Sequence, residues 1–105
     1  MATFNDREKS FENKFAHDAE LQFKADARRN KLLGLWAAQL LGKSGDDAAS
    51  YAKALVKSYL EEAGHEAVYR KLSTDLGNKA DEATIRAKMS SLTVEAKAQI
   101  MSEQS

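Results

Sequence analysis

The segment Gly42-Lys43-Ser44 has the residue types found at the end of a phosphate-binding loop, which holds the phosphates of a nucleotide. That loop needs another glycine five positions before Gly42, where this chain has Ala37, and it follows a β-strand. The residues before Gly42 instead have helical periodicity. We therefore interpret the segment as the end of one helix and the cap of the next.

His17 and His65 are the only histidines, and the chain has no cysteine. Neither histidine has a spacing typical of a metal site. No serine, histidine and acid can be grouped by sequence into a catalytic triad. We therefore expect no enzyme activity and no metal ion, and we expect each histidine to lie in solvent at a helix junction.

One local concentration of positive charge consists of Lys24, Arg28, Arg29 and Lys31. Such clusters bind nucleic acid through its phosphates, so a helical nucleic-acid-binding or nucleotide-binding module using the basic face 24–31 is one hypothesis. No aromatic side chains interleave with the cluster, and acidic residues flank it. We favour a solvated helix face, because the 16 basic and 16 acidic residues of the chain cancel and give no long-range attraction to polyanions.

Residues 1–17, here called the N-terminal arm, differ in composition from the rest of the chain. Phenylalanines recur in it at offsets of seven and four, which places on one helical face Phe4, Phe11 and Phe15. These side chains either pack on the rest of the domain or form an amphipathic arm that docks on a partner. A helix of about 15 residues is marginal alone in water, so an undocked arm should be mobile or partly helical, with a joint at His17-Asp18.

The rest of the chain predicts helices that would support such an arm. Apolar residues spaced by three and four extend from Leu21 to Leu41, and the side chains expected to organise the core are Leu32, Trp36 and Leu40. Gly42 is typical of a helix end. A second helix follows a capping box at Ser44. Its apolar face consists of Ala48, Ala52, Leu55 and Tyr59 together with Ala49, Val56 and Leu60.

Two further helices complete the predicted fold. Gly64 and Gly77 bound a short one, and Asn78 or Asp81 begins the last, whose apolar stripe is Ile85, Met89, Leu92, Ala96 and Ile100. With no proline and short connections, the sequence predicts an all-α protein. Its expected parts are the arm (1–17) and a compact four-helix bundle (18–105) with helices at about 18–41, 45–63, 65–76 and 81–103. No signal peptide or bilayer-spanning run is present, so we expect a cytoplasmic protein.

Four stretches of the sequence stand out together: FNDREKSFENKFAHDAELQFKADARRNKLLGLWAAQLLG, GDDAASYA, GHEAVYRKL and KADEATIRAKM. They resemble the zeta subunit of the α-proteobacterial F-type ATP synthase, a family of small helical proteins. The resemblance covers essentially the whole chain. Two positions depart from the family pattern: Ala63 replaces a common proline, and Tyr59 stands where an acidic residue is common.

The resemblance implies an inhibitor of ATP hydrolysis by the synthase. The family's N-terminal segment enters a catalytic interface between the alpha and beta subunits and meets the central rotor, while the bundle stays outside. The matching residues in this chain, expected to bind the partner, are Phe4, Arg7, Phe11, Lys14 and Phe15. The resemblance also implies that the protein is associated with the synthase head at the inner face of the cytoplasmic membrane. No cofactor is required, and weak binding of an adenine nucleotide stays open.

Overall fold

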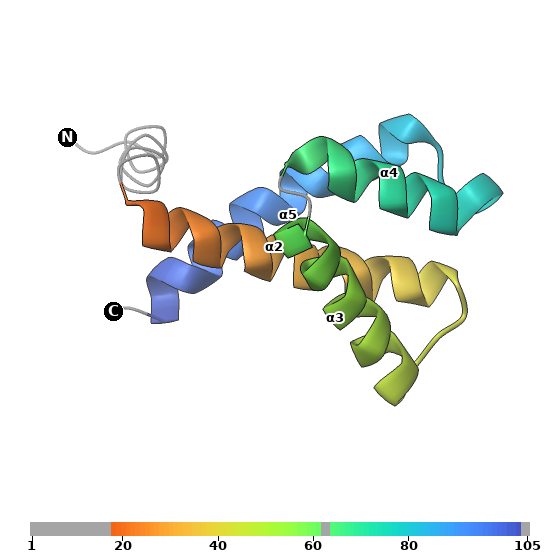
Figure 1. Cartoon of the computed structure of the whole chain (residues 1–105), viewed down its shortest axis with the longest axis horizontal. Coiled ribbons are helices and arrows are strands. Elements are labelled where there is room, and N and C mark those ends of the chain that lie inside the picture. Colours follow the sequence, from red (N-terminus) through yellow and green to blue (C-terminus); the bar gives the residue numbers. More distant parts are fainter. Residues whose placement is uncertain (1–17, 62–63, 104–105) are drawn as a thin grey trace.

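The computed structural model describes residues 18–61 and 64–103, which form four α-helices and contain no strand. The helices are α2 (Ala19–Leu40), α3 (Gly45–Glu61), α4 (His65–Leu76) and α5 (Glu82–Glu103), and a 3-10 turn, η1 (Gly77–Lys79), precedes α5. In Figure 1, α2 lies along the long axis, α5 lies beside its first half, and α3 and α4 flank its second half on opposite sides. The predicted all-α four-helix bundle is confirmed.

The helix ends follow from residues that the sequence offers for them. Gly42 has φ 77° and Gly77 has φ 54°, in the left-handed region that side chains with a Cβ disfavour, and these two glycines end α2 and α4. Of the two predicted starts for α5, Asp81 is the cap, because its Oδ1 accepts a hydrogen bond from the Thr84 amide at 2.8 Å. Asn78 lies within η1.

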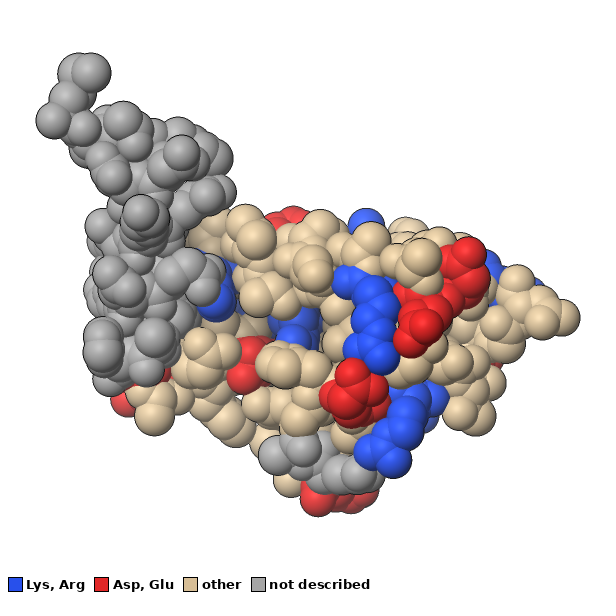
Figure 2. Space-filling model, turned by 90° about the horizontal axis from the view of Figure 1, so that it is seen from above, with Lys and Arg blue, Asp and Glu red and all other residues tan. Residues whose placement is uncertain are grey.

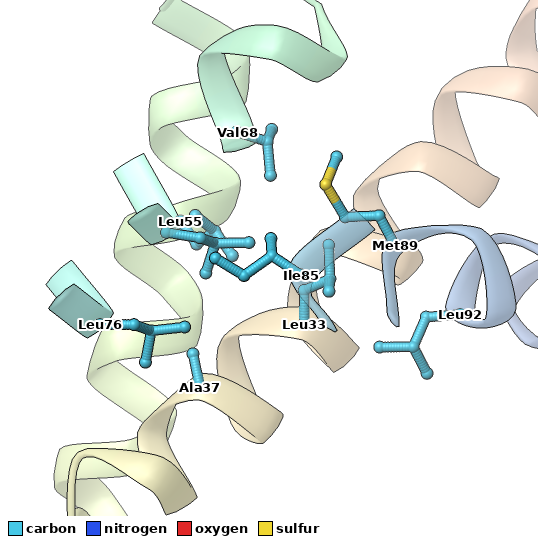
Figure 3. Packing of buried hydrophobic residues seen from close by; sticks show 9 residues of the cluster. Leu33, Ala37, Leu55, Val68, Leu76, Ile85, Met89 and Leu92 are labelled. Atoms are coloured by element: carbon cyan, nitrogen blue, oxygen red, sulfur yellow. The ribbon is translucent and has the colours of Figure 1, made fainter. Parts of the chain in front are cut away.

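The main core forms where all four helices meet. Figure 3 shows Leu33 and Ala37 of α2 facing Leu55 of α3 and Ile85 of α5. The whole cluster contains Leu33, Ala37, Leu55, Val68, Leu72, Leu76, Ile85, Met89 and Leu92. The five residues of the predicted stripe of α5 are all buried, so that prediction is confirmed.

The side of α2 that enters the core differs from the predicted one. Leu33 and Ala37 are fully buried, whereas Leu32 and Trp36 are half-buried and pack on the edge of the cluster. Leu40 is 37% exposed, so its expected place in the core was wrong. Almost every position from 32 to 41 is apolar, and the sequence period therefore could not determine which side of the helix packs inward.

Gly34 brings α2 and α3 unusually close together. A Cβ at this position would lie 2.5 Å from the Cα of Ala52 in α3, which is closer than real Cβ contacts allow. Only glycine therefore permits this approach, and the contact between α2 and α3 depends on it.

In the described ranges no helix is long and apolar enough to cross a bilayer.

Candidate functional site

The residues predicted to bind a partner all lie outside the part of the chain that the structure describes: Phe4, Arg7, Phe11, Lys14 and Phe15. Their role stays a prediction. What the structure describes is the bundle that carries the N-terminal arm, its point of attachment, and the surfaces beside that point.

The arm joins the bundle at Asp18, the cap of α2. The Asp18 Oδ1 accepts hydrogen bonds from the amides of Glu20 at 3.0 Å and Leu21 at 3.1 Å. The backbone of Asp18 is extended, with φ −119° and ψ 102°, so α2 begins after this residue. Leu21 is buried beside Ile100 of α5. The attachment point is therefore held on the bundle by a capped helix and by packing of its first turn.

An open groove of about 1030 Å³ lies between α2 and α3, next to the C-terminal end of α5. Three of the five large apolar side chains that are exposed in the described residues line it: Phe23 at 51%, Leu35 at 37% and Leu60 at 57%. The groove is therefore lined in part by large apolar side chains that are open to solvent. We call it the α2/α3 groove.

The rim of the α2/α3 groove is mostly basic. Its charged residues are Lys24, Arg28, Lys31, Lys53 and Lys57, with Asp46 and Glu103 as the acidic ones. Arg28 Nη2 lies 2.7 Å from Glu103 Oε1, and the hydrogen bond from Arg28 lowers the pKa of the Glu103 carboxyl. Lys31 and Lys53 form no ion pair with any residue in the described ranges. Lys24 lies 3.2 Å from Glu20 and Lys57 lies 3.9 Å from Glu61, so the positive charge that is left unpaired on the rim comes from Lys31 and Lys53.

The charges on the side of α4 and α5 are arranged differently. Arg86 donates two hydrogen bonds to Glu66, at 2.8 and 3.1 Å, and lies 3.4 Å from Glu82, one turn away on the same helix. The same guanidinium stacks on Tyr69, 3.9 Å from the ring centre. Figure 2, a view from the side on which α4 lies, shows basic and acidic residues next to each other. This side therefore has no comparable excess of one sign.

Arg29 does not belong to a solvated basic face, as the sequence suggested, because its side chain is buried at 2% exposure. It lies one turn from both Ala25 and Leu33 and so shares their inward direction. Its Nε and Nη2 donate to Asn30 Oδ1 at 3.0 and 2.9 Å, and its Nη1 donates to Nδ1 of His65. Desolvation lowers the pKa of Arg29, and the nearby charge of Asp26 opposes that shift.

Arg29 also contacts His65, which begins α4. A guanidinium can only donate, so Nδ1 of His65 is the acceptor in this contact. His65 is exposed at the start of α4, as expected, and the contact with Arg29 is an addition to that expectation. The hydrogen bond links α4 to α2 across the α3–α4 connection.

Asp26 of α2, which is also buried, is bonded to Tyr59 of α3. Its Oδ2 accepts a hydrogen bond from Tyr59 Oη at 2.9 Å, and its Oδ1 accepts one from Gln22 Nε2 at 2.9 Å. Burial and the bond to Asp26 raise the pKa of Tyr59. A carboxylate at position 59 would place a second negative charge beside Asp26, so the departure from the family pattern suits this neighbour. We call Asp26, Arg29, Asn30, Tyr59 and His65 the junction cluster.

The junction cluster holds three helices together and contains no nucleophile paired with a base. Across residues 18–61 and 64–103, no group of three or more metal-binding side chains occurs. Sequence reasoning missed the α2/α3 groove: Ala49, Val56 and Leu60 were predicted for the apolar face of α3, and the structure places them in the groove lining. Phe23 was an available signal, because it lies off the core-facing side of α2.

Comparisons with known proteins identify the family. The family model of ATPase inhibitor subunit zeta matches residues 1–99. No curated protein matches the sequence. A solved structure, described as a solution NMR structure of the protein, is 59% identical, covers 79% of this chain and 98% of its own, and superposes with a TM-score of 0.73. The chain therefore belongs to the ATPase inhibitor subunit zeta family.

Proposed function

We propose that this protein inhibits ATP hydrolysis by an F-type ATP synthase. The observation that carries the proposal is the match to the ATPase inhibitor subunit zeta family over residues 1–99. This range includes the whole N-terminal arm as well as almost all of the bundle. The family name describes a regulatory subunit, so the protein acts on the chemistry of another enzyme and needs no catalytic centre of its own.

The arm is the part that inhibits in this proposal. It enters a catalytic interface between the alpha and beta subunits and meets the central rotor, while the bundle stays outside at the inner face of the membrane. The phenylalanine face of the arm supports this role, because apolar side chains at helical spacing can serve as buried anchors. A helix wedged at this interface adds a free-energy barrier to rotation in the hydrolysis direction.

The bundle supports the arm mechanically. Asp18 caps α2, and Leu21 packs against α5, so the arm starts from a fixed point on a folded body. Ordering of the arm in the interface loses conformational entropy, which buried phenylalanines must offset. Arg7 and Lys14 would pair with acidic groups at the mouth of the interface, where they contribute to the encounter rate.

The test is ATP hydrolysis by the purified cognate synthase with increasing amounts of the full chain. We expect inhibition by the natural sequence, and a loss of at least tenfold in potency when Phe4, Phe11 and Phe15 are all changed to alanine. Val94→Ala is a matched control, because Val94 is 61% exposed on α5 and does not line the groove. A triple variant with full potency would remove the arm from the mechanism, and no inhibition by the natural chain would refute the function.

A further inference from the structure

We propose that the α2/α3 groove is a second contact with the synthase and binds an amphipathic helix whose apolar stripe is flanked by acidic side chains. This inference rests on the proposed function, because it places the bundle against the same enzyme that the arm enters. It adds a binding site on the bundle to the one on the arm. Three properties of the groove support it: its length, its apolar lining and its charge.

The length and form of the groove suit a helix. Its lining residues form one stripe on α2, from Phe23 to Leu35, and one on α3, from Asp46 to Leu60. At 1.5 Å per residue these stripes are roughly 18 and 21 Å long, which corresponds to a helix of three to four turns. Two neighbouring helices with a shared apolar face are a common receptor for a third amphipathic helix.

The lining provides anchoring positions along the whole groove. Phe23 and Leu60 are each more than half exposed, and Leu35 is exposed at the other end of the α2 stripe. Small residues between them leave room for a partner's side chains, namely Ala27, Ala49 and Ala52. An apolar stripe on the bound helix would cover all three large side chains and remove them from water.

The charge of the rim selects an acidic partner. Five basic and two acidic residues line the groove, and three of the basic ones have an acidic partner: Arg28 with Glu103, Lys24 with Glu20 and Lys57 with Glu61. Lys31 on α2 and Lys53 on α3 have no ion pair within the described ranges, so each is available for a carboxylate. Opposite charges across an interface increase both specificity and the rate of association.

Two other occupants fit this charge less well. The N-terminal arm has three acidic and three basic residues, so it offers no acidic excess, and its phenylalanine face is used at the catalytic interface in the proposed function. A second copy of the chain would place two basic rims against each other in a symmetric dimer. An acidic helix of the synthase satisfies both the apolar lining and the charge.

A second contact would strengthen inhibition without adding to the arm. When one of two linked sites is bound, the other site binds at a raised effective concentration. The groove would therefore slow the departure of the whole inhibitor, and its basic rim would speed the first encounter. Loss of the groove contact should weaken inhibition and leave the arm able to act.

The first experiment measures inhibition of the purified synthase by full-length variants. We expect Lys53→Glu to lower potency by roughly three- to tenfold at low salt and less at high salt, since screening shortens the reach of charges. Leu60→Ser should lower potency by a similar factor at both salt concentrations. The controls are Lys79→Glu in η1 and Val94→Ser in α5, neither of which lines the groove. Circular dichroism verifies that each variant stays folded.

The second experiment locates the occupant directly. The chain has no cysteine, so Leu60→Cys provides a single site for a photo-reactive cross-linker in the full-length protein. With purified synthase, we expect the cross-linked peptide to come from an acidic helical segment of one synthase subunit. Phe11→Cys should cross-link to a different peptide, at the catalytic interface.

The outcomes separate this inference from the proposed function. Groove variants that behave like the controls, while the natural chain still inhibits, overturn the groove contact only. Groove variants with higher potency, or a cross-link from position 60 to residues 1–17, mean that the arm itself occupies the groove, and this also overturns the inference. A cross-link between two inhibitor chains points to a dimer and overturns it as well. Absence of inhibition by the natural chain refutes the proposed function.

Discussion

One face of α2 buries charged side chains, whereas another face of the same helix leaves large apolar ones exposed. Asp26, Arg29 and Asn30 are buried in the junction cluster, while Phe23 and Leu35 line the α2/α3 groove. The inward side also buries apolar residues such as Leu33 and Ala37, so α2 is an amphipathic helix with polar residues added to its buried side and apolar ones to its exposed side. The first face joins three helices, and the second face carries the groove that we propose as a binding site.

The two faces also depend on their surroundings in different ways. A buried charge is tolerated only when its hydrogen-bonding groups are satisfied, and the guanidinium of Arg29 meets this condition through Asn30 and His65. An exposed apolar side chain requires no partner for folding. Substitutions on the first face should therefore affect stability, and substitutions on the second should affect binding.

The largest expected effect is that of Arg29→Ala. It removes the donor for Asn30 Oδ1 and His65 Nδ1 and leaves the buried Asp26 without its nearby cation. Breaking a buried charged group in this way costs about 3–5 kcal/mol of unfolding free energy. Urea unfolding followed by Trp36 fluorescence measures it. Lys31→Ala, two positions away on the groove rim, is the control and should change stability by less than about 0.5 kcal/mol. Equal losses of unfolding free energy for Arg29→Ala and Lys31→Ala would contradict the difference proposed between the two faces of α2.

The next effect is that of Gly34→Ala, at the contact of α2 with α3. The new Cβ would lie 2.5 Å from Ala52 Cα, so the helices must separate. Alanine gains up to about 1 kcal/mol of helix propensity over glycine, but overpacking costs typically about 1–3 kcal/mol. We expect a net loss of stability in thermal unfolding. An exposed Ala54→Gly change calibrates the propensity contribution alone, and a stabilising Gly34→Ala would show that the close approach is not required.

A smaller effect, dependent on pH, is expected for Tyr59→Phe. The change removes one hydrogen bond to Asp26, which keeps the bond from Gln22, so the loss at neutral pH should be about 1 kcal/mol. The folded-state pKa of Tyr59 is raised above its usual value of about 10, so its contribution is fully present below that pH and is lost as pH rises further. Unfolding free energies measured from pH 9 to 11.5 should fall less steeply for Tyr59→Phe than for the natural chain. If the unfolding free energies of the two proteins fell equally steeply with pH, the raised pKa of Tyr59 would not contribute to stability.

The smallest effect on stability is expected on the groove face. Leu60→Ser removes an apolar side chain that is 57% exposed, and such surface changes stay within about 0.5 kcal/mol. The same variant should nevertheless weaken inhibition of the synthase. A large loss of stability for Leu60→Ser would mean that the groove is part of the structural core, and the distinction between the two faces of α2 would no longer hold.

The helix boundaries could be predicted from sequence, because they depend on local chemistry. Gly42 and Gly77 take backbone conformations that other residues disfavour, and Asp18 and Asp81 accept hydrogen bonds from amides two or three positions later. These interactions involve neighbours in the chain. The apolar stripe of α5 was also predictable, since its period leaves one side of that helix for burial.

The family could be recognised from sequence as well, because FENKFAHDAE and ARRNKLLGLWAA are distinctive strings, and the family match over residues 1–99 confirms it. The residues proposed to inhibit lie outside the described ranges, so their place in the arm rests on that resemblance. Helix content, caps and family are thus properties that this sequence determined by itself.

Only the tertiary structure determined which side of α2 faces the core. Its apolar residues surround most of the helix between positions 32 and 41, so either Leu32 and Leu40 or Leu33 and Ala37 could have packed inward. The absence of a Cβ at Gly34 lets Ala52 approach, and Arg29 finds its partner on α4, 36 positions later in the chain. These contacts between distant segments bury Arg29 and leave Phe23 exposed, because the free energy of burial depends on which partners the fold brings together.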